Sequence, residues 1–356
     1  MDEATVRIYE ARGTEWVARR RPVRRADARA FARRVEHGRL RIDLGCGAGR
    51  YLADLGSPAV GIDAARAMLD MCRRAVPGAG LVQADLEALP FGRRTVHGAW
   101  ANMSYVHVPS VRLPLALADL HRALDVGAPL DIQVLRGDYE GHDLPQDDVG
   151  GRFFAAWTPQ SLGDVLVGAG FCDIDMEAED DVVRARATRA RTLPDFVGAG
   201  MRLLVVGLNP SLFAADAGVG FARPGNRFWP AARAAGLVAH DRDPVAALSE
   251  CGVGMTDIVK RATRSADELD GPEYATGMAR VERLVRWMQP GAVCFVGLSG
   301  WRAARDRRAA PGPQPQAFGG RPVYVLPSTS GANAHAQLPE LTAHLRAALD
   351  MPVTRW

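Results

Sequence analysis

Residues 40–52, LRIDLGCGAGRYL, decide the fold of the first half of the chain. A short apolar run ends at Asp43 and is followed by Gly45, Gly47 and Gly49 at alternate positions. Glycines at this spacing favour a tight turn from a strand into a helix, and they let a ligand approach the backbone where no Cβ intrudes. The stretch therefore predicts the first strand and a ligand-binding turn of an α/β sheet.

Short apolar segments recur outward from this stretch and alternate with helical segments. Strand-like runs continue the first half with PAVGID, GLVQAD, VHGAWANM and APLDIQVL, and they resume after residue 200 with RLLVVGLNP, GAVCFVGL and PVYVLPS. This rhythm is typical of repeated βα units, in which helices cover both faces of a mostly parallel sheet. The sequence thus predicts the α/β class throughout.

A change of composition divides the chain in two. The acidic run at 176–181 gives way to four arginines between 184 and 191, and then to proline and glycine. A chain of 356 residues also exceeds the usual size of one domain. The halves share no repeated motif, so we expect two different domains, 1–188 and 189–356. The proline-rich segment 311–322 is expected to be an internal loop.

The composition sets limits on the class of protein. With 47% hydrophobic and 24% charged residues and no run of roughly 18 apolar residues, the chain is typical of a soluble globular protein. The N-terminal residues lack an apolar signal segment, so we expect a cytoplasmic protein with no membrane partner. Five scattered cysteines without C-x-x-C pairs predict reduced thiols, without a disulfide framework or a metal site.

The net charge of +3 is unevenly distributed along the chain. The first 190 residues carry 25 arginines against 27 Asp and Glu, whereas the remainder carries 19 Lys and Arg against 14 acidic residues. A modest basic excess in the second half is compatible with phosphate contacts, although solvated arginine-rich helices produce the same excess.

Three acidic residues stand at the ends of three successive strand-like runs. Asp43 precedes the glycines, Asp63 ends AVGID twenty residues later, and Asp85 follows the third run. A carboxylate at the second position can accept both hydroxyls of a ribose, and one at the third can meet an adenine amino group. A glycine turn alone is weak evidence, but three acids in this order indicate a nucleoside-binding site.

These residues resemble the class I S-adenosylmethionine-dependent methyltransferases, over roughly residues 5–185. The resemblance extends to ALADLHRALDVGAPL (116–130) and to RFFAAWTPQSLGDVLVGAGF (152–171). It implies a Rossmann-like sheet and S-adenosylmethionine as cofactor. The residues that it assigns to cofactor binding are Asp43, Gly45, Gly47, Asp63, Asp85 and Leu86.

The methyl acceptor is less defined by the sequence. The segment ANMSYVHVP (101–109) replaces the Asn/Asp-Pro-Pro-Tyr/Phe loop of amino methyltransferases that act on DNA bases, and no Pro-Cys nucleophile is present. A base-modifying DNA methyltransferase is therefore disfavoured. Asn102, Ser104, Tyr105 and His107 are candidates to line an acceptor pocket or, equally, structural polar residues near a strand end. The acceptor, a small molecule or another substrate, stays open.

A second stretch, VVGLNPS (205–211), opens the other half with an amide where hydrolytic sites usually have a carboxylate. Asn-Pro alone is a turn signal, and on that interpretation Asn209 only ends a strand. Three further segments follow in order: GVGFARPGNRFWPAARAAGL (218–237), CGVGMTDIVKRATRSADEL (251–269) and VYVLPSTSGANAH (323–335). Together they resemble the mismatch-specific uracil- and thymine-DNA glycosylases, over roughly residues 193–350, which implies a uracil-DNA glycosylase-like three-layer α/β/α domain.

The resemblance implies a role for each of these segments. Asn209 would position the attacking water, and Phe221 would stack on a base flipped out of the duplex. Backbone amides near Leu208 and Phe221 would read the pyrimidine edge. The loop Ser330, Gly331, Ala332 and Asn333 would enter the DNA, whereas Phe228 and Trp229 are expected in the core. The implied partner is double-stranded DNA with a mispaired uracil, and this domain needs no cofactor.

Three positions depart from the better-known members of that family. Ser211 and Ala332 stand where those members have glycine and a large Leu or Arg, respectively. Leu326 stands where the highly efficient uracil glycosylases have histidine. His335, further along the loop, is expected to be exposed or to face a phosphate. These differences predict a preference for weakly paired sites.

The leading interpretation is a bifunctional fusion of a methyltransferase with a DNA glycosylase of base excision repair. The glycosylase would release uracil opposite guanine, and thymine and ethenocytosine are open as further substrates. The alternative makes one domain a non-catalytic module, either an S-adenosylmethionine sensor or a damaged-DNA binder. Neither the coupling of the two activities nor the oligomeric state follows from the sequence.

Overall fold

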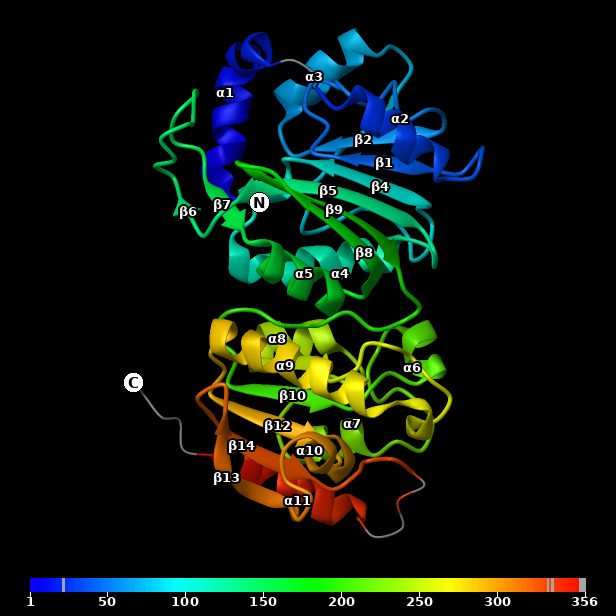
Figure 1. Ribbon diagram of the computed structural model, residues 1–356, viewed down its shortest axis with the longest axis vertical. Coiled ribbons are helices and arrows are strands. Elements are labelled where there is room, and N and C mark those ends of the chain that lie inside the picture. The colour runs from blue at the N-terminus through cyan, green and yellow to red at the C-terminus, as the bar shows by residue number, and fades with distance from the viewer. Residues whose placement is uncertain (21–22, 332, 334–335, 352–356) are drawn as a thin grey trace. The chain divides into compact units, whose positions relative to one another are not determined.

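The computed structural model describes residues 1–20, 23–331, 333 and 336–351, which form two compact units (Figure 1). The first unit comprises Met1–Val167 and Phe171–Ala190, and the second comprises Gly168–Gly170 and Arg191–Trp356. Each unit has its own sheet and its own core. Among the described residues, no helix is long and apolar enough to cross a membrane.

The first unit is built on a nine-stranded sheet in the order β3-β2-β1-β4-β5-β7-β6, with β9 also paired to β5 and β8 paired to β9. Its strands are β1 (Arg41–Leu44), β2 (Ala59–Asp63), β3 (Gly80–Gln83), β4 (Gly98–Asn102), β5 (Pro129–Arg136), β6 (Glu140–Gly141), β7 (Phe154–Trp157), β8 (Phe171–Ala178) and β9 (Val182–Arg189). Strands β1 to β5 pair in parallel, and β9 runs antiparallel to β5. The predicted parallel sheet is therefore confirmed.

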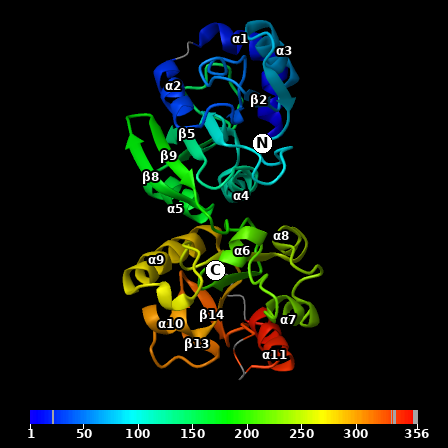
Figure 2. The same cartoon turned by 90° about the vertical axis from the view of Figure 1, so that its right-hand side faces the viewer.

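Helices cover both faces of this sheet. They are α1 (Glu3–Arg19), α2 (Arg25–Arg33), α3 (Arg66–Ala75), α4 (Leu113–Ala123) and α5 (Pro159–Gly168), with 3-10 turns η1 (Tyr105–His107) and η2 (Ser110–Arg112). Figures 1 and 2 show α2 and α3 on one face and α4 and α5 on the other. The buried strands β1, β4 and β5 lie between these layers, which explains why they read as nearly continuous apolar runs.

The glycine turn after β1 differs from the expected entry into a helix. Residues 48–55 form successive turns, and the next α-helix is α3, after β2. Gly49 has a φ of 80°, and a Cβ there would meet Val76 and overlap Cys72 Sγ. This left-handed residue, pressed against α3, interrupts helical geometry directly after the turn.

The second unit has a five-stranded sheet in the order β11-β10-β12-β14-β13. Its strands are β10 (Leu203–Gly207), β11 (Val253–Asp257), β12 (Ala292–Val296), β13 (Gly312–Phe318) and β14 (Arg321–Leu326). Its helices are α6 (Leu212–Ala217), α7 (Phe228–Ala234), α8 (Pro244–Cys251), α9 (Gly271–Met288), α10 (Leu298–Ala304) and α11 (Leu338–Leu349), with the 3-10 turn η3 (Ala266–Glu268).

The second unit has three layers, because helices pack against both faces of its sheet. Leu203 and Val205 join a core that contains Phe228 and Trp229 of α7 and Leu341 of α11. On β12, Phe295 packs instead against Trp301 of α10, with ring centroids 4.9 Å apart. Helices α7 and α11 therefore cover one face and α10 the other, as the predicted α/β/α arrangement requires. Phe228 and Trp229 are fully buried, as a core role requires.

The expectation of a loop at 311–322 is wrong. Residues Gly312–Phe318 form β13, which runs antiparallel to β14 and occupies the edge of the sheet. Proline lacks the amide hydrogen needed inside a sheet but is tolerated on an edge strand. The pairing of β13 with β14 also shifts register between Gln314 and Phe318, and such an irregularity tolerates Pro315. Proline content alone could not distinguish a loop from such an edge.

Each sheet reverses its strand order at one point. In the first unit this point lies between β1 and β4, and in the second it lies between β10 and β12. Ligands of open α/β sheets bind beyond the carboxyl ends of the strands at such points. The topology therefore predicts that ligands bind at the loops after β1 and β4 in the first unit, and at the loops after β10 and its neighbouring strands in the second.

Candidate functional sites

A cavity of about 360 Å³ lies in the first unit, where the strand order reverses between β1 and β4. Its lining combines the turn after β1, the end of β2, the segment after β4 and one side of α1. Its lining includes Asp43, Gly45, Gly47, Asp63, Ser104 and His107. All six are sequence-predicted cofactor or acceptor residues, and they come from β1 and the turn after it, the end of β2, and the segment after β4.

The glycines after β1 are required by conformation and by close approach. Gly45 and Gly47 have φ values of 68° and 53°, which L-residues with a Cβ rarely adopt. A Cβ at Gly45 would overlap the side chain of Ser104. The amide of Cys46 donates to Ile62 O at 2.8 Å, which fixes the turn against β2. The turn and the loop after β4 therefore form one wall.

Asp63 is held at the end of β2 by backbone amides. Its Oδ2 accepts from Gly47 N and its Oδ1 from Ala65 N, both at 2.9 Å. Burial raises the pKa of this carboxyl to about 6, while the two amide hydrogen bonds act in the opposite direction. Each oxygen keeps a second lone pair, so the group can still accept hydroxyl donors from a ligand.

Two buried polar atoms of the cavity wall lack protein partners. Asp43, 2% exposed, and Ser104, 5% exposed, have Oδ2 and Oγ, respectively, without any hydrogen bond among the described residues. Burial, with nearby Cys72 and Asp63, raises the pKa of Asp43 to about 8. Because buried polar groups are normally satisfied, these atoms indicate a polar ligand that completes their hydrogen bonds.

Asp85 and Leu86 do not line this cavity. Both oxygens of Asp85 accept from the amino group of Met1 at 2.7 Å, and Met1 itself lies on the cavity wall. Leu86 is fully buried. Met1 therefore lies between Asp85 and the cavity in this structure.

Helix α1 contributes a polar wall that sequence reasoning did not find. The hydroxyl of Tyr9 accepts from Arg152 Nη1 at 2.8 Å and lies 2.9 Å from His107 Nε2. His107 Nδ1 donates to Phe153 O at 2.7 Å, so Nε2 is the acceptor of the Tyr9 proton. Burial lowers the pKa of His107 to about 4 and raises that of Tyr9 to about 12. Both are neutral at pH 7.

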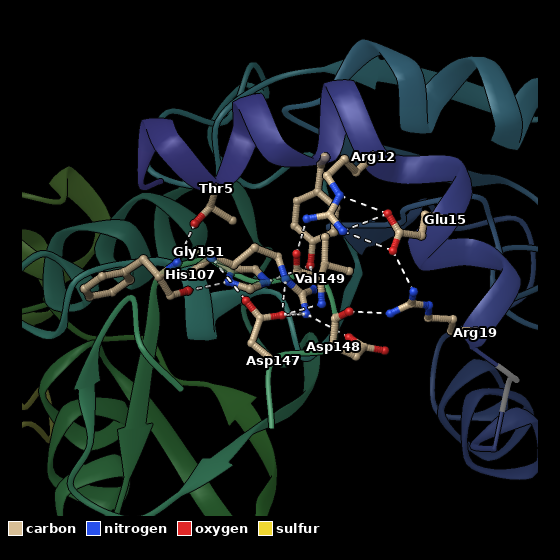
Figure 3. Close-up of polar contacts among 12 residues, drawn as sticks. Thr5, Arg12, Glu15, Arg19, His107, Asp147, Asp148, Val149 and Gly151 are labelled. Atoms are coloured by element: carbon tan, nitrogen blue, oxygen red, sulfur yellow. Dashed lines mark hydrogen bonds and ion pairs between the residues drawn. The ribbon is translucent and has the colours of Figure 1, made fainter. Parts of the chain in front are cut away.

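Helix α1 also forms polar contacts with the segment 147–153, as Figure 3 shows. Arg12 donates to Val149 O, Arg19 donates to Asp148 O, and Thr5 Oγ1 accepts from Phe153 N at 2.8 Å. Asp147 pairs with buried Arg152. Two segments more than 120 positions apart thus close one side of the cavity. The only sequence signal was an aromatic pair seven residues apart, Tyr9 and Trp16, whose centroids lie 5.6 Å apart.

The four candidate acceptor residues differ in placement. Asn102, Ser104 and His107 line the cavity, whereas Tyr105 is fully buried outside its lining. Asn102 Oδ1 accepts from Arg24 Nη1 at 3.1 Å, and Met103 next to it has a φ of 58°. A left-handed non-glycine residue beside a cavity is a feature that clusters at functional sites.

In the second unit, the amide of Asn209 has a fixed orientation. Its Nδ2 donates to Thr263 Oγ1 at 2.8 Å, to Arg261 O at 3.0 Å and to Pro210 O at 3.3 Å. No described residue donates to its Oδ1. Two of the three acceptors, on Thr263 and Arg261, come from the segment after β11, which also binds the 207–208 backbone through Ile258 N and Val259 N. The side chain therefore presents a carbonyl oxygen rather than an amine.

Leu208 precedes this asparagine, and the ring of Phe221 lies near Gly207, two residues before it. Phe221 has a φ of 57° and stacks on Phe228, with centroids 4.3 Å apart and an interplanar angle of 26°. Trp229 Nε1 donates to Gly220 O at 2.8 Å, which ties the Phe221 loop to the core. Leu208 O accepts from Val259 N. The ring of Phe221 packs on the core through Phe228, next to a backbone conformation that non-glycine residues rarely adopt.

Arg227 anchors the segment that follows β14, through Thr329, Ser330 and Asn333. Arg227 N donates to Thr329 O at 2.9 Å, and its Nη2 donates to Ser330 O at 2.7 Å and to Asn333 O at 2.5 Å. A Cβ at Gly331 would come 2.8 Å from Gly225 O, so the loop lies against the Pro-Gly-Asn-Arg segment. Ala332 and His335 lie outside the described residues.

Two of the departures from the expected family have structural explanations. Ser211 Oγ accepts from Ala214 N at 3.1 Å and caps α6, a role for which serine is preferred. Leu326 ends β14 and is fully buried in the core. A histidine there would not reach a ligand without leaving this packing.

Asp257, at the end of β11, was not singled out from the sequence. It lies beside Gly207 in the register of β10 and β11. Burial raises the pKa of this carboxyl to about 6. Next to it, Asp195 binds Lys260 and Arg280, each at 2.7 Å. Among the described residues, no group of three or more His, Cys, Asp or Glu is arranged to hold a metal ion.

Comparisons with known families divide the chain at the same place as the fold. Residues 194–350 match the family described as the uracil DNA glycosylase superfamily. Residues 42–127 match a methyltransferase domain. The chain therefore contains one region similar to a methyltransferase domain and one similar to the uracil DNA glycosylase superfamily, and the predicted two-domain α/β fold is confirmed.

Solved structures similar to this chain include three methyltransferase-type folds. One is an S-adenosylmethionine-dependent methyltransferase of Methanosarcina mazei, with 14% identity, a TM-score of 0.40, and coverage of 45% of this chain and 97% of that one. The DhpI–SAH complex has 18% identity, a TM-score of 0.44, and coverage of 53% and 96%. An S-adenosylmethionine-dependent methyltransferase of Thermotoga maritima has 16% identity, a TM-score of 0.41, and coverage of 52% and 99%.

Proposed function

We propose that this protein is a fusion of two enzymes, a mismatch-specific DNA glycosylase and an S-adenosylmethionine-dependent methyltransferase. The second unit would hydrolyse the N-glycosidic bond of uracil opposite guanine in double-stranded DNA. The match of residues 194–350 to the uracil DNA glycosylase superfamily supports the reaction class. The particular substrate is an inference from the site.

The observation that carries the glycosylase proposal is the orientation of Asn209. Three acceptors hold its Nδ2, which directs Oδ1 away from them and makes it available to accept a hydrogen bond from water. Cleavage passes through an oxocarbenium-like sugar, and the bonding electrons leave with the base. A positioned water is then sufficient, and a strong general base is not essential.

The surroundings of Asn209 fit a base that has left the duplex. The ring of Phe221 is backed on one face by Phe228 and is partly buried, so its other face can stack on a pyrimidine. The loop anchored by Arg227 carries Ser330, Gly331 and Asn333 and would contact the DNA. A mispaired uracil is the cheapest nucleotide to flip, because its pairing is already weak.

The glycosylase proposal is tested with the purified full-length protein and labelled duplexes. Duplexes with one G:U, G:T, G:ethenocytosine or A:U pair are incubated with excess protein and then cleaved with alkali. We expect strand cleavage at G:U and slower cleavage at A:U. Absence of cleavage at every lesion, with DNA binding intact, would leave the second unit as a damaged-DNA binder.

For the first unit, the observation that carries the proposal is the pair of unpartnered buried atoms, Asp43 Oδ2 and Ser104 Oγ. With Asp63 they form an acid-rich wall around a glycine turn that a Cβ would obstruct. The donors of S-adenosylmethionine, an ammonium and a ribose diol, match these acceptors. When bound, that cofactor supplies an electrophilic methyl group.

The residues of this unit would bind and orient rather than react. Asp63 would hold the ribose hydroxyls, and the closed wall from α1 would exclude water. His107 is neutral and its Nε2 already accepts the Tyr9 proton, so it would not act as a general base toward the acceptor. Alignment and desolvation carry most of the catalysis in such a transfer.

Titration calorimetry with S-adenosylmethionine tests this half of the proposal. Asp63→Ala should lose most of the affinity, because two charge-assisted hydrogen bonds, each worth about 1.5–3 kcal/mol, would disappear. Asp85→Ala is the informative comparison, since Asp85 lies behind Met1. No heat of binding for the wild-type protein would remove the methyltransferase assignment.

A further inference from the structure

Asp257 lies directly beside the signature of the second unit. It is the last residue of β11 and pairs with Gly207, the last residue of β10. Beyond this pair, Ile258 N donates to Gly207 O and Val259 N to Leu208 O, both at 2.9 Å. The carboxyl therefore stands next to the Gly-Leu-Asn turn that carries Asn209.

The position of Gly207 shows where the carboxyl points. A Cβ on Gly207 would overlap Asp257 Oδ1 and would lie 3.5 Å from Phe221 Cζ. One point above the strand end is thus bordered by the carboxyl and by the edge of the Phe221 ring. Asp257 Oδ1 and the edge of the Phe221 ring therefore lie near the same point at the end of β10.

No described residue forms a hydrogen bond with the Asp257 carboxyl. Within the described part of the chain, no hydrogen bond to its side chain is formed, and Arg280 Nη2 donates to its backbone oxygen at 2.8 Å. Lys260 and Arg280 direct their charges to Asp195. The Asp257 carboxyl, which receives no hydrogen bond from either nearby cation, is available to a ligand.

The charges around this carboxyl decide its protonation. Burial is the largest influence and raises its pKa to about 6; Asp195, before β10, acts in the same direction. Lys260 after β11 and Arg280 on α9 lower it, while β10 and the Phe221 loop face it with no ionisable group. The group is therefore an acid below about pH 6 and a carboxylate above.

We propose that Asp257 contacts the flipped pyrimidine, and that only its protonated form, by donating to a carbonyl oxygen of the base, promotes release of uracil. This rests on the glycosylase function proposed above. As the C1′–N1 bond breaks, its electron pair spreads over N1, O2 and O4 of the base. A carboxylic acid stabilises that charge through a hydrogen bond, whereas a carboxylate repels it. The proton stays on Asp257.

The test is the pH dependence of single-turnover excision on a G:U duplex with saturating full-length protein. The wild-type rate should fall about tenfold for each pH unit above the Asp257 titration, until residual catalysis sets a floor. Asp257→Asn carries a donor at every pH, so its profile should be flat, and its rate at pH 8 should exceed the wild-type rate at least tenfold. Glu250→Gln, which removes an exposed carboxylate paired with His240, should follow the wild-type profile.

The outcomes separate this inference from the function on which it rests. If neither wild type nor Asp257→Asn excises any base between pH 5 and 8, the glycosylase proposal itself fails. If the wild type excises uracil with a flat profile, or Asp257→Asn keeps the wild-type slope, the role of Asp257 is refuted and the function stands. Unchanged G:U duplex affinity of Asp257→Asn in fluorescence anisotropy shows that the variant is folded.

Discussion

At the scale of single residues, both sites depend on polar atoms whose protein partners cover only part of their hydrogen-bonding capacity. Asn209 uses Nδ2 for structure and keeps Oδ1, while Asp43 and Ser104 keep buried acceptors without partners. Such atoms are costly in a stable fold and persist where a ligand completes them. They distinguish these residues from the strand-end polar residues that they resemble in sequence.

We expect Asn209→Ala to reduce single-turnover excision at G:U by about 100-fold or more, because a preorganised group in the transition state is lost. Duplex affinity should change little. Thr263→Val removes one of three acceptors that orient the amide, so it should lower the rate by roughly fivefold, or about 1 kcal/mol. A wild-type rate in Asn209→Ala would contradict the proposed role of this amide.

Asp43 should make the first unit less stable as the pH rises. Its folded pKa of about 8 lies above the unfolded value near 4, so the folded state binds more protons in between and stability falls from about pH 4 to pH 8. Each pKa unit corresponds to about 1.4 kcal/mol. Hydrogen exchange of β1 amides at pH 5 and pH 8 should show this slope in the ligand-free protein. Asp43→Asn should remove it, and an equal slope in the variant would assign it to another group.

At the scale of elements, each site is completed by a segment that is distant in sequence. Helix α1 closes the first cavity through contacts with residues 147–153, as Figure 3 shows. Arg227, just before α7, anchors the loop after β14. In both cases arginine donors bind backbone carbonyls, which fixes loop position without depending on the identity of the loop side chains.

We predict that Arg227→Ala loosens the 328–333 loop, because two carbonyls lose their shared donor. Excision should then fall more on A:U than on G:U duplexes, since a well-paired base needs more help to leave the stack. Arg346→Ala, which removes a single bond to Ala234 O, is the control and should leave the ratio unchanged. Equal losses on both duplexes would mean that the loop acts on chemistry rather than on flipping.

For the cavity of the first unit, we expect Arg12→Ala combined with Arg19→Ala to loosen the contact between α1 and residues 148–149. Dissociation of S-adenosylmethionine should accelerate severalfold, because these contacts keep α1 in place over the bound cofactor. Association should change little. Stopped-flow measurement of both rates decides this. Arg7→Ala, which removes only an exposed pair with Glu3, is the matched control.

At the scale of the whole molecule, two sheets with separate cores are present in one chain. A ligand stabilises the unit that binds it according to its concentration and affinity. Calorimetric unfolding should therefore show two transitions. S-adenosylmethionine should raise only the transition of the first unit and a G:U duplex only that of the second. A single transition shifted by either ligand would show that the units unfold together.

Much of this organisation could be predicted from local sequence. The period of apolar runs fixes the α/β class, and the glycines at 45 and 47 are required by backbone conformations that other residues rarely adopt. The position of Asp63 at a strand end and of Asn209 after β10 follows from counting along the chain. Local rules failed at 311–322, where an edge strand tolerates proline, and at 48–55, where Gly49 prevents a helix.

The sequence by itself determined the class of fold and the residues at the strand ends, because these depend on the periodicity and conformational limits of neighbouring residues. Only the tertiary structure decided that Tyr9 and Arg152 meet His107, that Met1 lies against Asp85, and that Asp257 stands over Gly207 beside Phe221. Those contacts join segments that are far apart in the chain. Their geometry and their pKa values arise from burial, which no local pattern specifies.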